Sequence, residues 1–210
     1  MQDTLITTFD TALRTLFAKP HATHPCPTLP DRATVLTEQE KRHAAGLMRV
    51  NHVGEICAQA LYTAQALATP NAKLRASFVQ ARKEETDHLA WTAQRLDELG
   101  ERPSLLNPLW YAGAFGLGLL AGRLGDAASL GFVVETEKQV GAHLQSHLDA
   151  DNGGLPEGDH ASRAIVAQMH DDETRHANDA LAQGAIDLPQ PVKDLMRAAA
   201  KVMTTVAQRV

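Results

Sequence analysis

The chain contains the pattern Glu-x-x-His twice, as Glu85-Thr86-Asp87-His88 and as Glu173-Thr174-Arg175-His176. Residues three positions apart share one face of an α-helix, so each pattern can offer a carboxylate and an imidazole to the same metal ion. A single pattern is weak evidence, because it also occurs by chance on a solvated helix face. Two copies on separate predicted helices favour a metal site.

A further glutamate lies upstream of each pattern. Glu55 comes 30 positions before Glu85, and Glu137 comes 36 positions before Glu173. Bundles that bind two metal ions combine one glutamate from each of two helices with a Glu-x-x-His from each of two others. The doubled pattern therefore predicts a di-metal site with six ligands, which are Glu55, Glu85, His88, Glu137, Glu173 and His176.

Helical periodicity surrounds these residues, and no period-two strand pattern occurs. Pro70, Gly100, the Gly153-Gly154 pair and Gly184 mark helix ends, and Thr37 with Glu40 resembles a capping box. The predicted core helices cover residues 38–68, 71–99, 126–149 and 159–183.

Two helical hairpins joined by a long connection predict an all-α, ferritin-like four-helix bundle with two antiparallel hairpins and an apolar crossing segment. Extra helices are expected at both ends of the chain. The N-terminal one covers residues 3–18 and precedes a Pro-rich linker with prolines at 20, 25, 27 and 30. We therefore divide the chain into residues 1–35, the N-terminal amphipathic helix and linker, and residues 36–210, the ferritin-like di-metal domain.

The third core helix offers two acids, Glu135 and Glu137, which point about 200° apart on a helix. Glu137 shares an apolar stripe with Val133 and Val140, whereas Glu135 lies off that stripe. A carboxylate on a buried apolar face is costly unless a metal ion neutralises it. This pattern predicts Glu137 as the ligand.

Each Glu-x-x-His pattern is preceded by a second acid, Glu84 in the first copy and Asp172 in the second. Ligating histidines usually donate their other ring N–H to an acceptor outside the metal site. We expect Glu84 and Asp172 each to take this role for a ligating histidine, either in the same hairpin or in the opposite one. The alternative is that both acids are simply solvated.

The composition argues against several classes of partner and of metal site. A net charge of −5 without a long basic run argues against nucleic acid as a partner. The two cysteines form no Cys-x-x-Cys, which argues against a zinc ribbon or a disulfide scaffold. Four carboxylates and two imidazoles suit iron or manganese better than structural zinc.

The connection between the hairpins contains an unusually apolar stretch, residues 105–122, with no charge before Arg123. It is too short to span a bilayer as a helix, but its composition suits the membrane surface. The alternative is a self-association surface, since its glycines could let two helices approach closely. The side chains expected to meet the membrane or substrate are Leu105, Leu109, Trp110, Phe115, Leu117 and Leu120.

The run Met48-Arg49-Val50-Asn51-His52-Val53-Gly54-Glu55 resembles the first-helix motif of the demethoxyubiquinone hydroxylase family. The two Glu-x-x-His patterns and Glu137 resemble the remaining metal motifs of that family in order and spacing. The resemblance covers residues 42–182, and weakly the last helix. Glu84 departs from it, because the family pattern has aspartate at that position.

The resemblance implies a di-iron monooxygenase that uses O2 to hydroxylate the ring of a polyprenylated demethoxy-benzoquinol in ubiquinone biosynthesis. It implies two carboxylate-bridged Fe2+ ions, Glu55 with His88 on one, Glu137 with His176 on the other, and Glu85 and Glu173 bridging.

It also implies a peripheral membrane protein on the cytoplasmic face of a bacterial inner membrane. Its partners would be other ubiquinone-biosynthesis proteins or further copies of the chain. A ferroxidase or iron-binding protein, and a non-catalytic lipid-binding assembly protein, remain the alternative functions.

Overall fold

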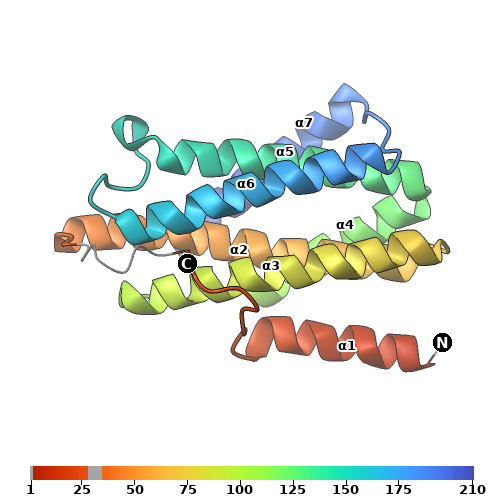
Figure 1. Ribbon diagram of the computed structural model, residues 1–210, viewed down its shortest axis with the longest axis horizontal. Helices are drawn as coiled ribbons and strands as arrows, with labels where there is room; N and C mark the ends of the chain where they lie inside the picture. Colours follow the sequence, from red (N-terminus) through yellow and green to blue (C-terminus); the bar gives the residue numbers. More distant parts are fainter. Residues whose placement is uncertain (1, 28–34) are drawn as a thin grey trace.

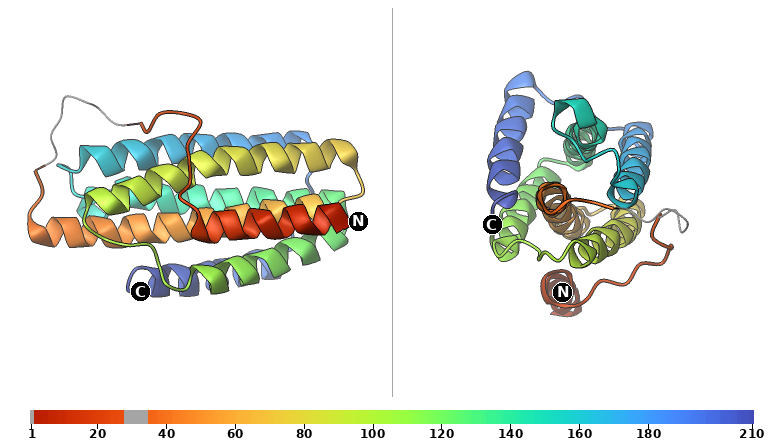
Figure 2. Two further views of the ribbon diagram at one scale, coloured as in Figure 1. Left: turned by 90° about the horizontal axis from the view of Figure 1, so that it is seen from below. Right: turned by 90° about the vertical axis from the view of Figure 1, so that its left-hand side faces the viewer.

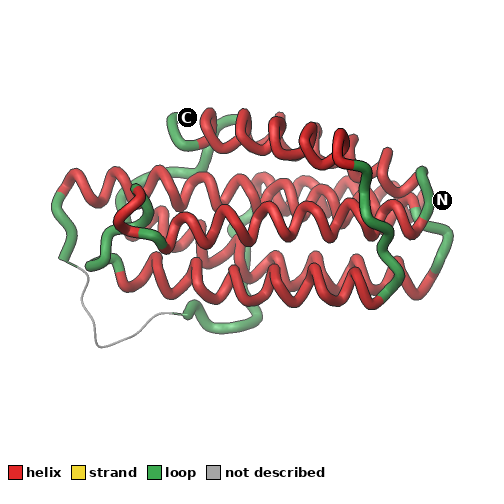
Figure 3. Tube along the Cα trace, turned by 90° about the horizontal axis from the view of Figure 1, so that it is seen from above, coloured by secondary structure: helices red, strands yellow, loops and turns green. Residues whose placement is uncertain are grey.

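The computed structural model describes residues 2–27 and 35–210, and the regular structure in these ranges is helical (Figures 1 and 3). The all-α prediction is confirmed, and each core helix ends within one residue of its predicted position. Residues 28–34 of the Pro-rich linker, including Pro30, lie outside the described residues. The helices are α1 (Gln2–Phe17), α2 (Glu38–Ala68), α3 (Ala72–Glu98), α4 (Asn107–Arg123), α5 (Asp126–Leu148), α6 (His160–Ala182) and α7 (Gln190–Ala207), with a 3-10 turn at Ala150–Asn152.

Local chemistry sets the ends of the core helices. The predicted capping box is confirmed, because the Thr37 hydroxyl accepts from the Glu40 backbone N–H and the Glu40 carboxylate accepts from the Thr37 N–H at 2.8 Å. The Asn71 side chain accepts from two backbone N–H groups of the first turn of α3. Gly100 and Gly125 have φ angles of +76° and +106°, which favour glycine at these chain reversals.

Helices α2 and α3 form one antiparallel hairpin, and α5 and α6 form the other (Figure 1). Seen end-on, these four helices make the bundle, while α1, α4 and α7 lie outside it (Figure 2). The ferritin-like bundle with additional N- and C-terminal helices is therefore confirmed. The long connection lets α5 start at the same end of the bundle as α3.

Most of the apolar crossing segment forms the helix α4. Two of its glycines are needed for packing against α2 within the same chain: a Cβ on Gly118 would lie 2.8 Å from the Leu61 carbonyl oxygen, and one on Gly122 would lie 2.5 Å from the Ala68 Cβ. A Cβ on Gly113 or Gly116 would meet nothing within 4 Å. The close helix approach that these two glycines allow is therefore between α4 and α2 of the same chain.

The opposite face of α4 carries apolar side chains into solvent. Leu105, just before the helix, and Leu109 are 67% and 61% exposed, and Leu117 and Leu120 are also exposed. Trp110 and Phe115 are half-buried. None of the described helices is both long enough and apolar enough to cross a membrane.

The N-terminal segment is attached to the bundle beside the first Glu-x-x-His pattern. The buried Asp87 carboxylate accepts from the backbone N–H groups of Thr23 and His24, and the Trp91 indole N–H donates to the His24 carbonyl at 3.2 Å. That residues 1–35 form a separate unit remains a prediction.

Two apolar clusters fill the interior of the bundle. One contains Met48 and Leu144, and the other contains Phe78 and Val133. Between them lies a layer of buried carboxylates and imidazoles. Apolar packing at both ends therefore fixes the four helices around a polar middle.

Candidate metal centre

The six predicted ligands come together in that polar layer. They form two groups whose ligand atoms lie within 4.8 Å of one another, and Glu85 and Glu173 belong to both groups. Glu55 and His88 complete the first group, and Glu137 and His176 complete the second. All six residues are at most 5% exposed. The arrangement matches the expected pairing, with two shared carboxylates between two sites.

Each imidazole points its Nδ1 at the carboxylates. His88 Nδ1 lies 3.2 Å from Glu85 and 3.4 Å from Glu173, and 3.7 Å from Glu55. His176 Nδ1 lies 3.1 Å from Glu85 and 3.3 Å from Glu173. The i, i+3 spacing on α3 and α6 supplies these contacts, because it stacks the carboxylate and the imidazole on one helix face.

The opposite ring nitrogen of each histidine contacts an acid from the other hairpin. His88 Nε2 lies 3.1 Å from Asp172 on α6, and His176 Nε2 lies 2.9 Å from Glu84 on α3. Arg175 joins the two acids, with its guanidinium 2.9 Å from each. Glu84 and Asp172 therefore lie where acceptors for ligating histidines were predicted, and each crosses between the hairpins.

Hydrogen bonds decide the charge of these outer acids. Partial burial raises the pKa of Asp172, but hydrogen bonds from His88 and Arg175 outweigh it and lower that pKa. Partial burial also raises the pKa of Glu84, but hydrogen bonds from His176, Gln80 and Arg175 outweigh it and lower that pKa. Both acids are thus ionised and can hold the imidazoles in one orientation.

Burial of the inner cluster costs free energy when no cation is bound. It raises the pKa values of Glu55 and Glu137 well above 4.5, and neighbouring carboxylates raise them further. Burial lowers the pKa of His176, but its hydrogen bonds to Glu173 and Glu85 outweigh this and raise it to about 12. Protons therefore supply the positive charge when no metal is bound.

The cluster fits a pair of metal ions. Oε2 of Glu55 is buried and has no hydrogen-bond partner, which is costly for a carboxylate oxygen. Metal ions would satisfy it and replace the protons on the imidazoles. The oxygen-rich donor set with one nitrogen for each metal is suited to iron or manganese.

Glu135 lies outside the cluster, where its carboxylate accepts a hydrogen bond from Gln139 at 2.6 Å. Glu137 instead faces inward and accepts a 2.6 Å hydrogen bond from the Tyr62 hydroxyl. Sequence reasoning missed this role of Tyr62. Its position seven residues after Glu55 places it on the same face of α2, but its contact with α5 depends on tertiary packing.

A family model for the ubiquinone biosynthesis protein COQ7 matches residues 42–207. The chain belongs to the COQ7 family. A relative from Albidiferax ferrireducens is 70% identical over 210 residues, covering 100% of this chain and 98% of its own. A relative from Polaromonas naphthalenivorans is 67% identical over 208 residues, covering 99% and 98%. Both relatives are named 3-demethoxyubiquinol 3-hydroxylase. The resemblance seen in the motifs is thus confirmed.

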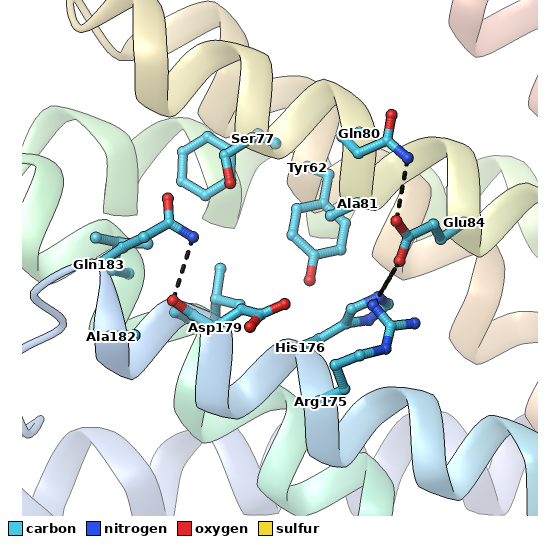
Figure 4. Close-up of a pocket in the computed structure, with 14 residues that line it drawn as sticks. Tyr62, Ser77, Gln80, Ala81, Glu84, Arg175, His176, Asp179, Ala182 and Gln183 are labelled. Atoms are coloured by element: carbon cyan, nitrogen blue, oxygen red, sulfur yellow. Dashed lines mark hydrogen bonds and ion pairs between the residues drawn. The ribbon is translucent and has the colours of Figure 1, made fainter.

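A cavity and a much smaller space adjoin the cluster of this COQ7-family chain. A cavity of about 350 Å³ lies between α3 and α6, with Tyr62 and His176 at its inner end and Glu84, Arg175 and Asp179 among its lining residues (Figure 4). It approaches the cluster from the side where Glu84 and Arg175 already engage the outer nitrogen of His176.

The second space, of about 10 Å³, lies between α2 and α5. Its lining is mainly apolar and includes Glu137 and Tyr62. Leu61 and Gln65, which also line it, lie where α2 contacts Gly118 and Gly122 of α4. The space is therefore lined by α2 and α5, which contribute one candidate ligand each.

Proposed function

We propose that this COQ7-family chain is an O2-dependent di-iron monooxygenase that hydroxylates the ring of a polyprenylated demethoxy-benzoquinol. The observation that carries the proposal is the buried six-residue cluster, divided into two groups that share Glu85 and Glu173. Family membership and the names of the relatives support the substrate and the reaction.

Glu55 and His88 would hold one iron, Glu137 and His176 the other, and Glu85 and Glu173 would bridge them. Bound iron would relay electrons to O2 and offer the positions at which O2 binds. A hydroxylation that inserts one oxygen atom consumes two electrons and two protons besides O2, and releases one water molecule. An external reductant must therefore provide the two electrons.

The chain itself would contribute orientation and a dry environment. Asp172 and Glu84 would accept the Nε2–H groups of His88 and His176, leaving each Nδ1 lone pair directed at the metal. Arg175 would keep both acids ionised and in place. Apolar clusters on both sides of the layer would exclude bulk water, which would limit side reactions during turnover.

A membrane surface would deliver the substrate, because a polyprenyl tail is insoluble in water. The exposed leucines of α4 support this, since burying one such side chain contributes roughly 1.5–3 kcal/mol. On this proposal the chain is a peripheral membrane protein of the cytoplasmic face of the inner membrane.

The test is product analysis. Iron-loaded protein is incubated with O2, a reductant and a demethoxy-benzoquinol, and the quinol is analysed by mass spectrometry with ¹⁸O2. Incorporation of one labelled oxygen atom is expected. Fe2+ oxidation at an unchanged rate without quinol, and no oxygenated product, would favour the ferroxidase alternative. Quinol binding without O2 consumption would favour the assembly-protein alternative.

A further inference from the structure

The two Glu-x-x-His patterns begin 88 positions apart (173 − 85), and the residues around them correspond at the same offset. Corresponding contacts join the two helices, because His88 Nε2 contacts Asp172 on α6 and His176 Nε2 contacts Glu84 on α3. Helices α3 and α6 therefore face each other with approximate twofold symmetry. Where corresponding residues differ in size or charge, the two ends of the metal centre differ in the same way.

The end of the metal centre at His88 is filled by large side chains. Four of them, each at most 7% exposed, lie where α3 meets α6: Trp91, Arg95, Ile165 and Met169. The Trp91 ring packs against the His88 imidazole, with 5.4 Å between the ring centroids. The Arg95 guanidinium forms a buried ion pair with Asp159 on the α6 side, at 2.9 Å. Side chains therefore close this end.

The end at His176 has small or polar residues at the corresponding positions. In the same order, these are Asp179, Gln183, Ser77 and Ala81, each 88 positions from its counterpart. All four line the cavity of about 350 Å³ between α3 and α6 (Figure 4). A water molecule takes about 30 Å³ in the liquid, so the cavity has room for an ion with several of its waters. The cavity therefore occupies the place that large side chains fill at the other end.

Asp179 gives this cavity a carboxylate close to the metal centre. It follows His176 by three positions, so it extends the ligand face of α6 by one turn. Its carboxylate points into the cavity, towards the Tyr62 hydroxyl (Figure 4). The cation in the lining, Arg175, already pairs with the two outer acids at 2.9 Å each. Asp179 therefore adds a negative charge that Arg175 does not neutralise.

The cavity reaches the second group of candidate ligands. Its lining includes His176 and Tyr62, and the Tyr62 hydroxyl lies 2.6 Å from the Glu137 carboxylate. Seen end-on, α3 and α6 lie on the side of the bundle away from α4 and α7 (Figure 2). The cavity therefore faces water when the exposed leucines of α4 face a membrane.

We propose that divalent metal ions enter and leave the centre through this α3–α6 cavity, attracted by Asp179 and received first by His176 and Glu137. Fe2+ is the ion that the proposed function requires, and carboxylates and imidazoles both bind it. The other group of ligands would receive its ion through the shared carboxylates, Glu85 and Glu173. The inference rests on the metal centre of the proposed function and not on its substrate.

A route of entry changes the rates of binding but not the equilibrium. Uptake is measured by mixing Fe2+ with the metal-free chain without O2 and following tryptophan fluorescence, because the Trp91 ring packs against His88. Release is measured by adding an excess of a coloured chelator to the iron-loaded chain, and affinity by equilibrium competition with a weaker chelator. A residue on the route should change uptake and release together, whereas a residue that supports a ligand should change the affinity.

Asp179→Asn keeps the shape of the side chain and removes its charge. Fe2+ uptake should slow about three- to tenfold, which is part of the roughly 10–1,000-fold effect of steering ions into charged clefts. Uptake by the unchanged chain should also fall more steeply with added salt than uptake by the variant, because salt screens the attraction that the variant lacks. Asp171→Asn is the matched control, since Asp171 is on the same helix, its side chain is 82% exposed, and it lies outside the cavity lining. Its rates should equal those of the unchanged chain.

Ser77→Ile combined with Ala81→Met fills the cavity with the residues of the closed end. Uptake and release should both slow about tenfold or more, because an ion then passes only when the helices open transiently. The affinity should change much less, because no ligand is altered. Ala76→Met, on the exposed face of α3, is the matched control and should leave the rates unchanged. Melting temperatures show whether each variant folds, and Asp179→Asn decides alone if the double variant does not.

Unchanged uptake and release in Asp179→Asn and in the folded double variant would overturn the proposal. Slower uptake with an equal loss of affinity would also overturn it, because these residues would then support the ligands rather than the route. A chain that takes up no Fe2+ would overturn the route and the proposed metal centre together. The ¹⁸O2 experiment decides the proposed function separately, because ring oxygenation with normal loading rates in the variants would leave hydroxylation standing and remove only the route.

Discussion

Replacing Asp172 by alanine should weaken iron binding at the His88 end of the cluster and leave the bundle folded. The Asp172 carboxylate lies 3.1 Å from His88 Nε2 and 2.9 Å from the Arg175 guanidinium. A hydrogen bond that involves a charged group contributes about 1.5–3 kcal/mol, and about 1.4 kcal/mol corresponds to a tenfold change in affinity. Because Glu84 still holds Arg175 and Asp172 is partly exposed, we expect the lower part of that range, about 10–30-fold weaker iron binding.

The assay titrates metal-free protein with Fe2+ without O2, in competition with a chelator of known affinity. Asp171→Ala is the matched control, because Asp171 is the preceding residue, its side chain is 82% exposed, and its contact with His170 is 3.6 Å long. Asp172→Asn, which keeps an acceptor without the charge, should fall between Asp172→Ala and the unchanged chain. Melting temperatures of the metal-free variants show whether the fold is retained.

A role for Asp172 in iron binding is refuted if Asp172→Ala binds iron as tightly as Asp171→Ala and both turn over quinol equally. In that case the acid is merely solvated, and the 3.1 Å contact with His88 does nothing for the metal. A loss of iron that accompanies a large drop in melting temperature would instead show a structural role for the acid.

Glu137→Ala should lose one iron per chain by metal analysis, whereas Glu135→Ala should keep both, and the reverse result would exchange their roles. The metal-free protein should become less stable as the pH rises. The folded state raises the pKa of His176 from 6.5 to about 12, so stability from that proton is complete below pH 6.5 and is lost as the pH rises towards 12. Thermal scans of metal-free and iron-loaded protein between pH 6.5 and 9 should show a decline only in the former. Replacing Leu117 and Leu120 by glutamate should abolish flotation with anionic liposomes and reduce turnover of long-tailed but not tail-less quinols. Retained flotation with a smaller oligomer would make α4 a subunit interface.

The core helices and the candidate ligands could be predicted from the sequence because both depend on local spacing. The i, i+3 spacing places Glu85 beside His88 on any helix, whatever surrounds it. The position of Glu137 on an apolar stripe likewise follows from the period of the helix, and the structure has Glu137 facing inward and Glu135 outside the cluster. Thr37 and Glu40 set the start of α2 through contacts within one turn.

Contacts between helices required the tertiary structure. The sequence indicated that Glu84 and Asp172 could accept hydrogen bonds from the ligating histidines. The approach of the two hairpins decided that each acid contacts the histidine of the opposite hairpin. The role of Arg175 as the link between these acids follows from the same approach of α3 to α6.

In the apolar crossing segment, too, some features follow from the sequence and others from the packing of helices. Its composition predicted apolar contacts with a membrane or with another subunit, and the structure has Gly118 packed against α2 within the chain while Leu117 faces solvent. Which glycine lies against which helix depends on the rotation of α4 about its own axis. Local spacing thus determined which residues can act together, and packing decided which of them meet.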